Sequence, residues 1–147
     1  MIDKALQEAL AARDRAHAPY SRFHVGCAVE SVDGEVAVGA NMENACYRLG
    51  VCAEQSALAA AQQAFGLENV ARVVVVGGFA DAGDEPGDAV MPCGGCRQAI
   101  AEAAGLARRD IEVVCHDHRG RGAVRSTIGE LLPAAFDLES APEAAGS

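Results

Sequence analysis

Four consecutive valines occupy residues 73–76, in the middle of the chain and between two segments with a helical pattern. An unbroken run of β-branched side chains is typical of a central strand that is buried on both faces of its sheet. Such a strand needs a layer of structure packed on each side. The run therefore predicts an α/β fold, a three-layer α/β/α sandwich.

Helical and strand patterns precede the valine run. Apolar residues recur at helical spacing over residues 2–16, and Pro19 ends that pattern. Residues 24–30 and 35–40 are expected to form two strands joined by a turn at Asp33-Gly34. The segment 41–51 is expected to be a loop.

Two further helices and one more strand are expected in the rest of the chain. They are an alanine-rich helix over 53–65 that Gly66 closes, a helix over 93–104, and a strand over 111–115. We interpret both helices as right-handed crossovers, each connecting two strands that pair in parallel. Thr127 and Glu130 form a capping box before a short helix near Leu131.

Length and composition limit the class of protein. The chain has 147 residues, half of them apolar, which suits one globular domain. We expect this domain over residues 1–138 and a flexible tail over residues 139–147. The net charge is −9, and the single Lys and eleven Arg are scattered. A groove for a nucleic-acid polymer needs clustered positive charge, so such a partner is not expected.

The compartment also follows from the sequence pattern. No run of about 18 apolar residues is present, so no membrane partner is expected. Residues 1–15 lack the apolar stretch and cleavage site of a secretory signal. We therefore expect a cytoplasmic protein whose six cysteines stay reduced.

Three of the cysteines coincide with the predicted starts of two helices. Cys52 precedes the first helix, and Cys93 and Cys96 fall in the first turn of the second, directly after Pro92. Free amides and the helix dipole at such ends favour thiolates. Three thiolates can hold one zinc ion and leave a fourth position open to water, as in a catalytic zinc site.

Glu54 lies two residues after Cys52, so it can share this site without being a ligand. A carboxylate beside zinc-bound water can take its proton and deliver it to a leaving group. A ligand two residues before a Glu, followed later by P-C-x-x-C, is the known pattern of zinc deaminases that act on nucleobases.

Two alternatives stay open for these cysteines. They could be inert buried residues, which is the usual role of a single cysteine. They could also hold a structural zinc closed by a fourth ligand, for which the residue types offer Cys27, Cys46, Cys115, His116 and His118. We interpret the other cysteines as small apolar side chains and the four histidines as surface or polar-contact residues.

Over residues 20–138 the chain resembles the cytidine deaminase family in its small homotetrameric form. The matching stretches are Pro19-Tyr20-Ser21-Arg22-Phe23 with Val25-Gly26, Asn41-Met42-Glu43-Asn44-Ala45-Cys46-Tyr47, Cys52-Ala53-Glu54, Pro92-Cys93-Gly94-Gly95-Cys96-Arg97-Gln98, and Leu131-Leu132-Pro133 with Phe136. The resemblance implies the fold of that family, with a mixed sheet of about five strands.

The resemblance also implies a role for each matching residue. One Zn²⁺ per subunit would be held by Cys52, Cys93 and Cys96, and Glu54 would be the proton shuttle. The substrate contacts would be Asn41 and Glu43 on the ribose hydroxyls, Phe23 as a wall of the base pocket, and the backbones of Ala53 and Met91 on the pyrimidine edge. In a homotetramer, a neighbouring subunit's site would be completed by Ala45, Tyr47 and Phe136.

The implied reaction is hydrolytic deamination of cytidine and deoxycytidine to uridine and deoxyuridine, a step of pyrimidine salvage. Zinc-bound hydroxide would attack C4, while Glu54 passes a proton to N3 and then to the departing amine. One position departs from the family, because Gln55 follows Glu54 where the three-thiolate members usually carry Arg. We expect helix dipoles and Arg97 to offset the negative charge instead.

The sequence leaves three other functions open. The chain could deaminate a related pyrimidine compound, such as a nucleoside antibiotic or a modified cytidine. It could edit a polynucleotide, which its acidic balance opposes. It could be a non-enzymatic, zinc-stabilised binding module, which would need a closed metal site with four protein ligands.

Overall fold

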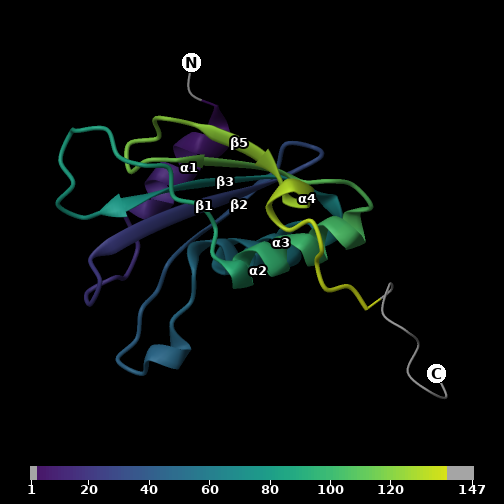
Figure 1. Ribbon diagram of the computed structural model, residues 1–147, viewed down its shortest axis with the longest axis horizontal. Helices are drawn as coiled ribbons and strands as arrows, with labels where there is room; N and C mark the ends of the chain where they lie inside the picture. Colours follow the sequence, from purple (N-terminus) through teal and green to yellow (C-terminus); the bar gives the residue numbers. More distant parts are fainter. Residues whose placement is uncertain (1–2, 139–147) are drawn as a thin grey trace.

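The computed structural model describes residues 3–138 and arranges them as one sheet between two helical layers (Figure 1). The strands β1 (Phe23–Ser31), β2 (Val36–Ala40), β3 (Val70–Phe79), β4 (Glu112–His116) and β5 (Val124–Thr127) lie in the order β2-β1-β3-β4-β5. Helices α2 (Ala53–Ala64) and α3 (Gly94–Ala107) cover one face, and α1 (Lys4–Arg13) covers the other. The short elements are the 3-10 helices η1 (Tyr47–Leu49) and η2 (Leu67–Asn69) and the helix α4 (Ile128–Leu131).

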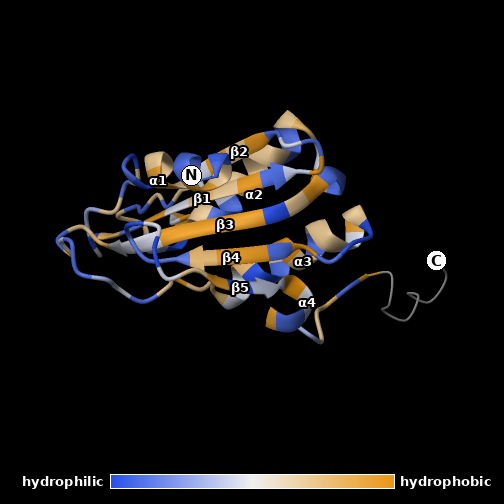
Figure 2. Cartoon of the chain, turned by 90° about the horizontal axis from the view of Figure 1, so that it is seen from above, coloured by the Kyte–Doolittle hydropathy of each residue, from blue (hydrophilic) through white to orange (hydrophobic). Residues whose placement is uncertain are grey.

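The valine run lies on β3, the central strand, which is hydrophobic along most of its length (Figure 2). Val73 and Val75 belong to the core under α2 and α3, whereas Val74 and Val76 pack with residues of α1. Each of the four valines is at most 1% exposed. The prediction of a strand buried on both faces, and with it the three-layer sandwich, is confirmed.

Helix α2 lies very close to β2, which determines where the first turn of the helix stands. A Cβ atom built on Gly39 of β2 would lie 2.4 Å from the backbone nitrogen of Ala57 in α2. Because only glycine lacks that atom, Gly39 permits the close approach. The helix begins directly after Cys52, and Glu54 in its first turn is only 5% exposed.

One of the two predicted crossovers connects its strands differently. The strands β3 and β4 pair in parallel, as expected for the connection through α3. In contrast, β2 and β3 do not pair, because β1 lies between them and is antiparallel to both. The strands β2 and β3 still run in the same direction, as predicted, but the prediction that they pair is wrong. The strand β1 has five buried residues in succession and β2 has a mixed pattern, so pairing β3 with β1 buries more apolar surface.

Several predicted boundaries change, and one strand is new. The strand β5 pairs antiparallel with β4 at the edge of the sheet. Its first two residues are exposed, so its sequence lacks the alternation of apolar and polar residues that would predict a strand. The helix predicted over 2–16 is shorter, because Asp3 caps α1 by accepting the N–H of Leu6 and the helix ends at Arg13. The capping box of Thr127 and Glu130 is confirmed.

The remaining cysteines and histidines follow the expectations only in part. Cys27 and Cys115 are buried as expected, but Cys46 is exposed. His116 and His118 are buried, and each places a ring nitrogen near a backbone carbonyl oxygen, so of the two expected roles they have the polar-contact one. The predicted tail over 139–147 lies outside the described residues. Within residues 3–138, the longest apolar helices are too short to cross a membrane.

Candidate metal centre and substrate pocket

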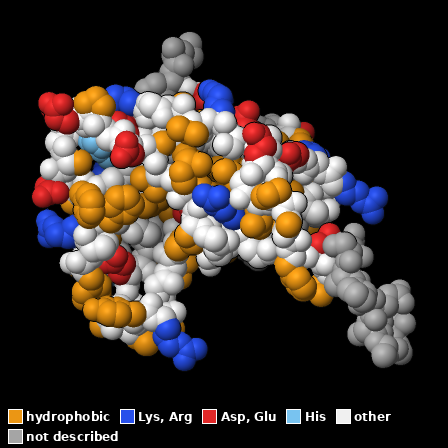
Figure 3. Space-filling model, viewed as in Figure 1, with side chains coloured by type: hydrophobic (Ala, Val, Ile, Leu, Met, Phe, Trp, Pro, Cys, Tyr) orange, Lys and Arg blue, Asp and Glu red, His pale blue; other side chains and the backbone are white. Residues whose placement is uncertain are grey.

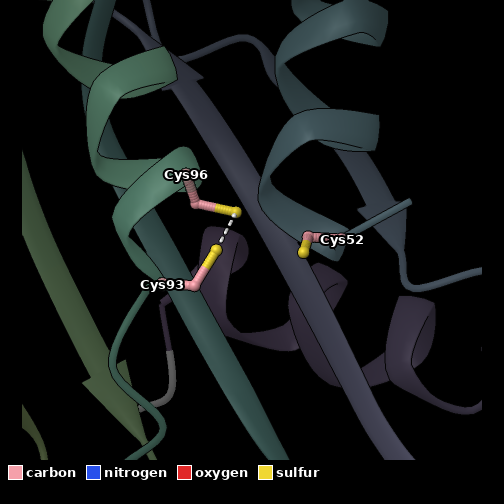
Figure 4. A group of neighbouring side chains, drawn as sticks. All are labelled: Cys52, Cys93 and Cys96. Carbon is pink, nitrogen blue, oxygen red and sulfur yellow. Dashed lines mark hydrogen bonds between the residues drawn. The ribbon is translucent and has the colours of Figure 1, made fainter. Parts of the chain in front are cut away.

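Three cysteine sulfurs meet where α2 and α3 begin (Figure 4). Cys52 and Cys93 are the N-cap residues of the two helices, and Cys96 lies in the first turn of α3. The three sulfur atoms lie within 4.8 Å of one another, with 3.4 Å between those of Cys93 and Cys96. Sulfur ligands about 2.3 Å from a tetrahedral zinc lie about 3.8 Å apart. The group therefore fits a zinc ion, although Cys93 caps the helix instead of occupying its first turn.

The cysteine group leaves room for a ligand that the protein does not supply. Within the described part of the chain, no fourth His, Cys, Asp or Glu belongs to the group. Cys96 is buried, Cys52 is half-buried and Cys93 is exposed, so one side of the group is open to solvent. Three thiolates with an open fourth position match a catalytic zinc site, and a closed structural site finds no support among these residues.

The electrostatics of the sulfurs differ from one cysteine to the next. Burial raises the pKa of the Cys52 and Cys96 thiols, whereas the backbone N–H of Cys96 lowers the pKa of Cys93. Gln55 Nε2 donates a hydrogen bond to Cys96 Sγ, 3.7 Å away. A metal ion competes with protons for thiolates. Zinc binding at this group is therefore expected to release protons and to weaken as the pH falls.

A cavity of about 320 Å³ lies beside the cysteines. The substrate contacts that the sequence predicted all line it, together with two of the cysteines and Glu54. Its lining residues are Ser21, Phe23, Val25, Asn41, Glu43, Cys52, Ala53, Glu54, Val90, Met91 and Cys93. The sequence did not predict a role for Ser21, Val25 or Val90, because an isolated serine or valine carries no spacing that marks a site.

Glu54 combines burial with access to this cavity. It is 5% exposed, and burial raises the pKa of its carboxyl group. A carboxyl group with a raised pKa can hold a proton at a pH where an exposed glutamate is ionised. This is the property required of a group that takes a proton in one step and returns it in the next.

Glu43 and Asn41 form a polar end of the cavity. Glu43 accepts hydrogen bonds from the Ser21 hydroxyl at 2.5 Å and from the backbone N–H groups of Tyr20 and Ser21. The Ser21 hydroxyl is the main cause of the lowered pKa of Glu43, which stays an ionised acceptor. Asn41 accepts the Val25 N–H and donates to the Phe23 carbonyl. Its amide retains one further hydrogen for a ligand.

The residues predicted for a neighbouring subunit do not line this cavity. Ala45 and Tyr47 belong to the segment 43–50, which projects from the body of the molecule with hydrophobic side chains along it (Figure 3). Tyr47 is 82% exposed and Phe136 is 67% exposed. Arg97 donates to the carbonyl oxygens of Pro92 at 2.8 Å and Leu131 at 3.1 Å, so its guanidinium group contacts backbone.

Comparison with known proteins places the chain in a family. Residues 1–111 match the model of the cytidine and deoxycytidylate deaminase zinc-binding region. The chain belongs to this deaminase family. It is 43% identical over 134 residues to the cytidine deaminase of Halalkalibacterium halodurans, covering 91% of this chain and 92% of that protein. With the cytidine deaminase of Mycobacterium tuberculosis it shares 37% identity over 127 residues, covering 86% and 83%.

A solved structure agrees with this assignment. The crystal structure of cytidine deaminase from Burkholderia pseudomallei matches with a TM-score of 0.76 at 39% identity, covering 90% of this chain and 96% of that one. The resemblance read from the motifs is thus confirmed over most of the chain. Because the deaminase family is defined by a zinc-binding region, the cofactor that fits the three cysteines is zinc.

Proposed function

We propose that this deaminase is a zinc-dependent hydrolase that converts cytidine or deoxycytidine and water to uridine or deoxyuridine and ammonia. The observation that carries the proposal is one cavity lined by the cysteine group, the buried Glu54 and the polar pair Asn41 and Glu43. A site of about 300 Å³ or more with few convergent polar groups is typical for a small ligand.

Cys52, Cys93 and Cys96 would hold the metal in this function. Zinc, when bound there, supplies a Lewis acid that makes a water molecule acidic near neutral pH. The Glu54 carboxylate accepts a proton from the attacking water and donates it to N3 of the base. Glu54 would then take the proton of the new hydroxyl group at C4 and pass it to the amino group, so that the C4 carbonyl forms as the C4–N bond breaks and ammonia leaves. The burial of Glu54 supports this role, because it favours the protonated form between the two transfers.

The nucleoside would be oriented by the other residues of the cavity. The ionised Glu43 accepts from ribose hydroxyls, and the free amide hydrogen of Asn41 donates to one. The Phe23 ring packs against the base and is itself held edge-to-face by Phe79, with 5.0 Å between the ring centroids. The backbones of Ala53 and Met91 contact the polar edge of the pyrimidine. All five residues line one cavity, which supports these assignments.

Substitutions of Gln55 test how the negative charge of the three thiolates is balanced. Replacing Gln55 with Arg places a positive charge beside Cys96, which should strengthen zinc binding and move the acidic limb of the pH–rate profile down by about one pH unit. The control Gln55→Ala removes the hydrogen bond without adding charge. The two readouts are zinc affinity in a chelator competition and the pH dependence of kcat. If Gln55→Arg leaves both unchanged, Gln55 has no electrostatic role.

We propose that four copies of the chain assemble and that Ala45, Tyr47 and Phe136 complete a neighbouring pocket. Tyr47 and Leu49 are exposed on the projecting segment 43–50, and Phe136 is exposed near the other end of the described chain. Exposed apolar surface of this kind is typical of a protein interface. Light scattering should give the mass of four chains, and a fully active monomer would contradict the proposal.

The cellular role follows from the same site. Residues 1–138 would act as one nucleoside deaminase domain of pyrimidine salvage in the cytoplasm. The helices α1, α2 and α3 pack on a single sheet, which supports one domain. A site of three thiolates needs reduced cysteines, and a reducing compartment maintains them.

Ammonia release from a set of substrates tests the proposed function. We expect turnover of cytidine and deoxycytidine, and much slower turnover of cytosine, because the free base cannot contact Asn41 and Glu43. On the face drawn in Figure 3 the Lys and Arg side chains are scattered. We therefore expect no turnover of a single-stranded polynucleotide. A modified cytidine that reacts faster than cytidine would favour the related-compound alternative. No turnover by zinc-loaded protein would reject the function.

A further inference from the structure

The segment 80–91, which Pro92 and Cys93 connect to α3, forms part of the substrate cavity without a helix or strand of its own. Val90 and Met91 at its end line the cavity, whereas its first part is an exposed run of Gly, Asp, Glu and Pro residues. Such a segment loses much conformational freedom when it is ordered. Contacts from elsewhere in the chain must therefore hold it in place.

Packing against the sheet does not supply those contacts along most of the segment. A second cavity of about 420 Å³ lies between residues 82–90 and the end of β3 at Gly77, Gly78 and Phe79. It shares Phe23 and Val90 with the substrate cavity. Atoms that face an open space lack dispersion contacts on that side. The segment thus forms a roof over one cavity and a wall of the other.

The turn between β4 and β5 holds this segment through Asp117 and Arg121, which we call the loop anchor. Asp117 is 1% exposed, and its carboxylate accepts the Gly87 N–H at 3.1 Å and the Arg121 Nε at 3.2 Å. The two terminal nitrogens of Arg121 donate to the carbonyl oxygens of Asp84 at 2.9 Å and Glu85 at 3.1 Å. Hydrogen bonds from charged groups such as these are stronger than neutral ones.

The charge of the loop anchor is stable at neutral pH. Burial opposes ionisation of Asp117, but N–H donors from Arg121, Gly87 and Arg119 outweigh it and lower its pKa to about 2. Two neighbours reinforce the contact, since His118 places Nε2 2.7 Å from the Gly83 carbonyl oxygen and Arg119 pairs with Asp84. The whole stretch 83–87 is therefore tied to one turn.

The anchored stretch is connected directly to the pocket wall. Val90 follows Gly87 by three residues, and its N–H donates to the His116 carbonyl at 3.2 Å. Its side chain packs against the sheet so closely that a Cβ on Gly77 would lie 3.0 Å from Val90 Cγ2. Only two residues separate Val90 from the anchored stretch, so a shift of residues 83–87 would pull Val90, the wall that the two cavities share, away from these contacts.

We propose that Asp117 and Arg121 are positioning residues for nucleoside binding, because they hold the stretch 83–87 and thereby keep Val90 and Met91 in the wall of the substrate cavity. The inference rests on the proposed function. Neither residue lines the substrate cavity, so each acts through the segment. The start of α3 has its own support, the Arg97 hydrogen bond to Pro92, so the cysteine group should be unaffected.

Arg121→Ala tests this inference, because it removes the donors to Asp84 and Glu85 together with the Nε donor to Asp117. We expect KM for cytidine to rise about tenfold, with kcat within about twofold and zinc content unchanged. Hydrogen exchange of residues 80–91 should become faster. Arg121→Lys restores the charge without the planar fork and should rescue KM only in part. The matched control is Arg125→Ala, which breaks an exposed ion pair with Glu112 in the same hairpin and should leave KM unchanged.

Two results would overturn the inference. An unchanged KM in Arg121→Ala would show that the anchor does not serve binding, and a joint loss of kcat and zinc would show that it serves the metal group instead. Asp117→Asn should repeat the rise in KM. Should that variant fail to fold, Arg121→Ala decides, because the Arg121 side chain is 42% exposed. If zinc-loaded wild-type protein does not turn over cytidine, the proposed function is rejected. Hydrogen exchange of residues 80–91 in the wild type and in Arg121→Ala would still show whether the loop anchor holds the segment.

Discussion

Replacing Glu54 with Gln is expected to lower kcat for cytidine by about 10³-fold to 10⁴-fold, near the upper end of what one general acid–base group contributes. Gln has nearly the same shape but can neither accept nor return a proton at the pH of the reaction. The zinc content should stay at the wild-type value, because the three cysteines hold the ion and Glu54 does not belong to their group. Steady-state kinetics with metal analysis of the same sample provides the measurement.

The stability of this variant separates chemistry from folding. Burial raises the pKa of Glu54, so its contribution to stability is present at low pH and is lost as the pH rises through that pKa. Removing the charge should therefore leave the Tm at neutral pH equal or higher. Glu102→Gln, an exposed change on α3, is the control and should leave kcat unchanged. A Glu54→Gln variant with full zinc and more than about a tenth of wild-type kcat would remove Glu54 from the mechanism.

Replacing Cys96 with Ser is expected to weaken zinc binding by at least about a hundredfold and to abolish turnover at limiting zinc. A binding free energy of about 10–16 kcal/mol shared among a few ligands amounts to about 3 kcal/mol or more for each of them. Cys96 is also the buried member of the group, so its loss cannot be replaced by solvent as readily as that of Cys93. Chelator competition and metal analysis measure the change.

Thermal unfolding gives a second measurement of the same site. A ligand that binds only the folded state raises Tm, so a chelator should lower the Tm of the wild type and leave that of Cys96→Ser unchanged. The raised pKa values of Cys52 and Cys96 also predict that wild-type zinc affinity falls as the pH falls. Cys46→Ser, a change of an exposed thiol outside the group, should keep the wild-type zinc content. Full zinc occupancy with wild-type affinity in Cys96→Ser would contradict the site.

The metal group could be predicted because its members are marked by local patterns. Cys52 directly precedes an alanine-rich helix, and Cys93 and Cys96 follow Pro92 at the start of another. The same is true of Glu54, whose position two residues after Cys52 is readable without a fold. The polar pair Asn41 and Glu43 was found only by resemblance, because their own pattern indicates no more than a turn.

Other parts of the molecule could not be predicted, because no local sequence pattern identifies them. The edge strand β5 is largely exposed and therefore lacks the alternation that identifies a strand. Ser21 lines the cavity and bonds Glu43 from twenty-two residues away, so its role depends on two segments that meet only in the fold. Val90 is one of many valines, and nothing in the sequence distinguishes it as a wall residue.

The sequence by itself determined the chemistry of this deaminase: three thiolates at two helix starts, a carboxylate beside them and a central strand that needs cover on both faces. These features depend on residue types and on spacings of a few residues. The tertiary structure alone decided that β3 pairs with β1 instead of β2, and that Asp117 holds Gly87 across thirty residues of chain. Such contacts are selected by the free energy of packing the whole chain, which no local spacing encodes.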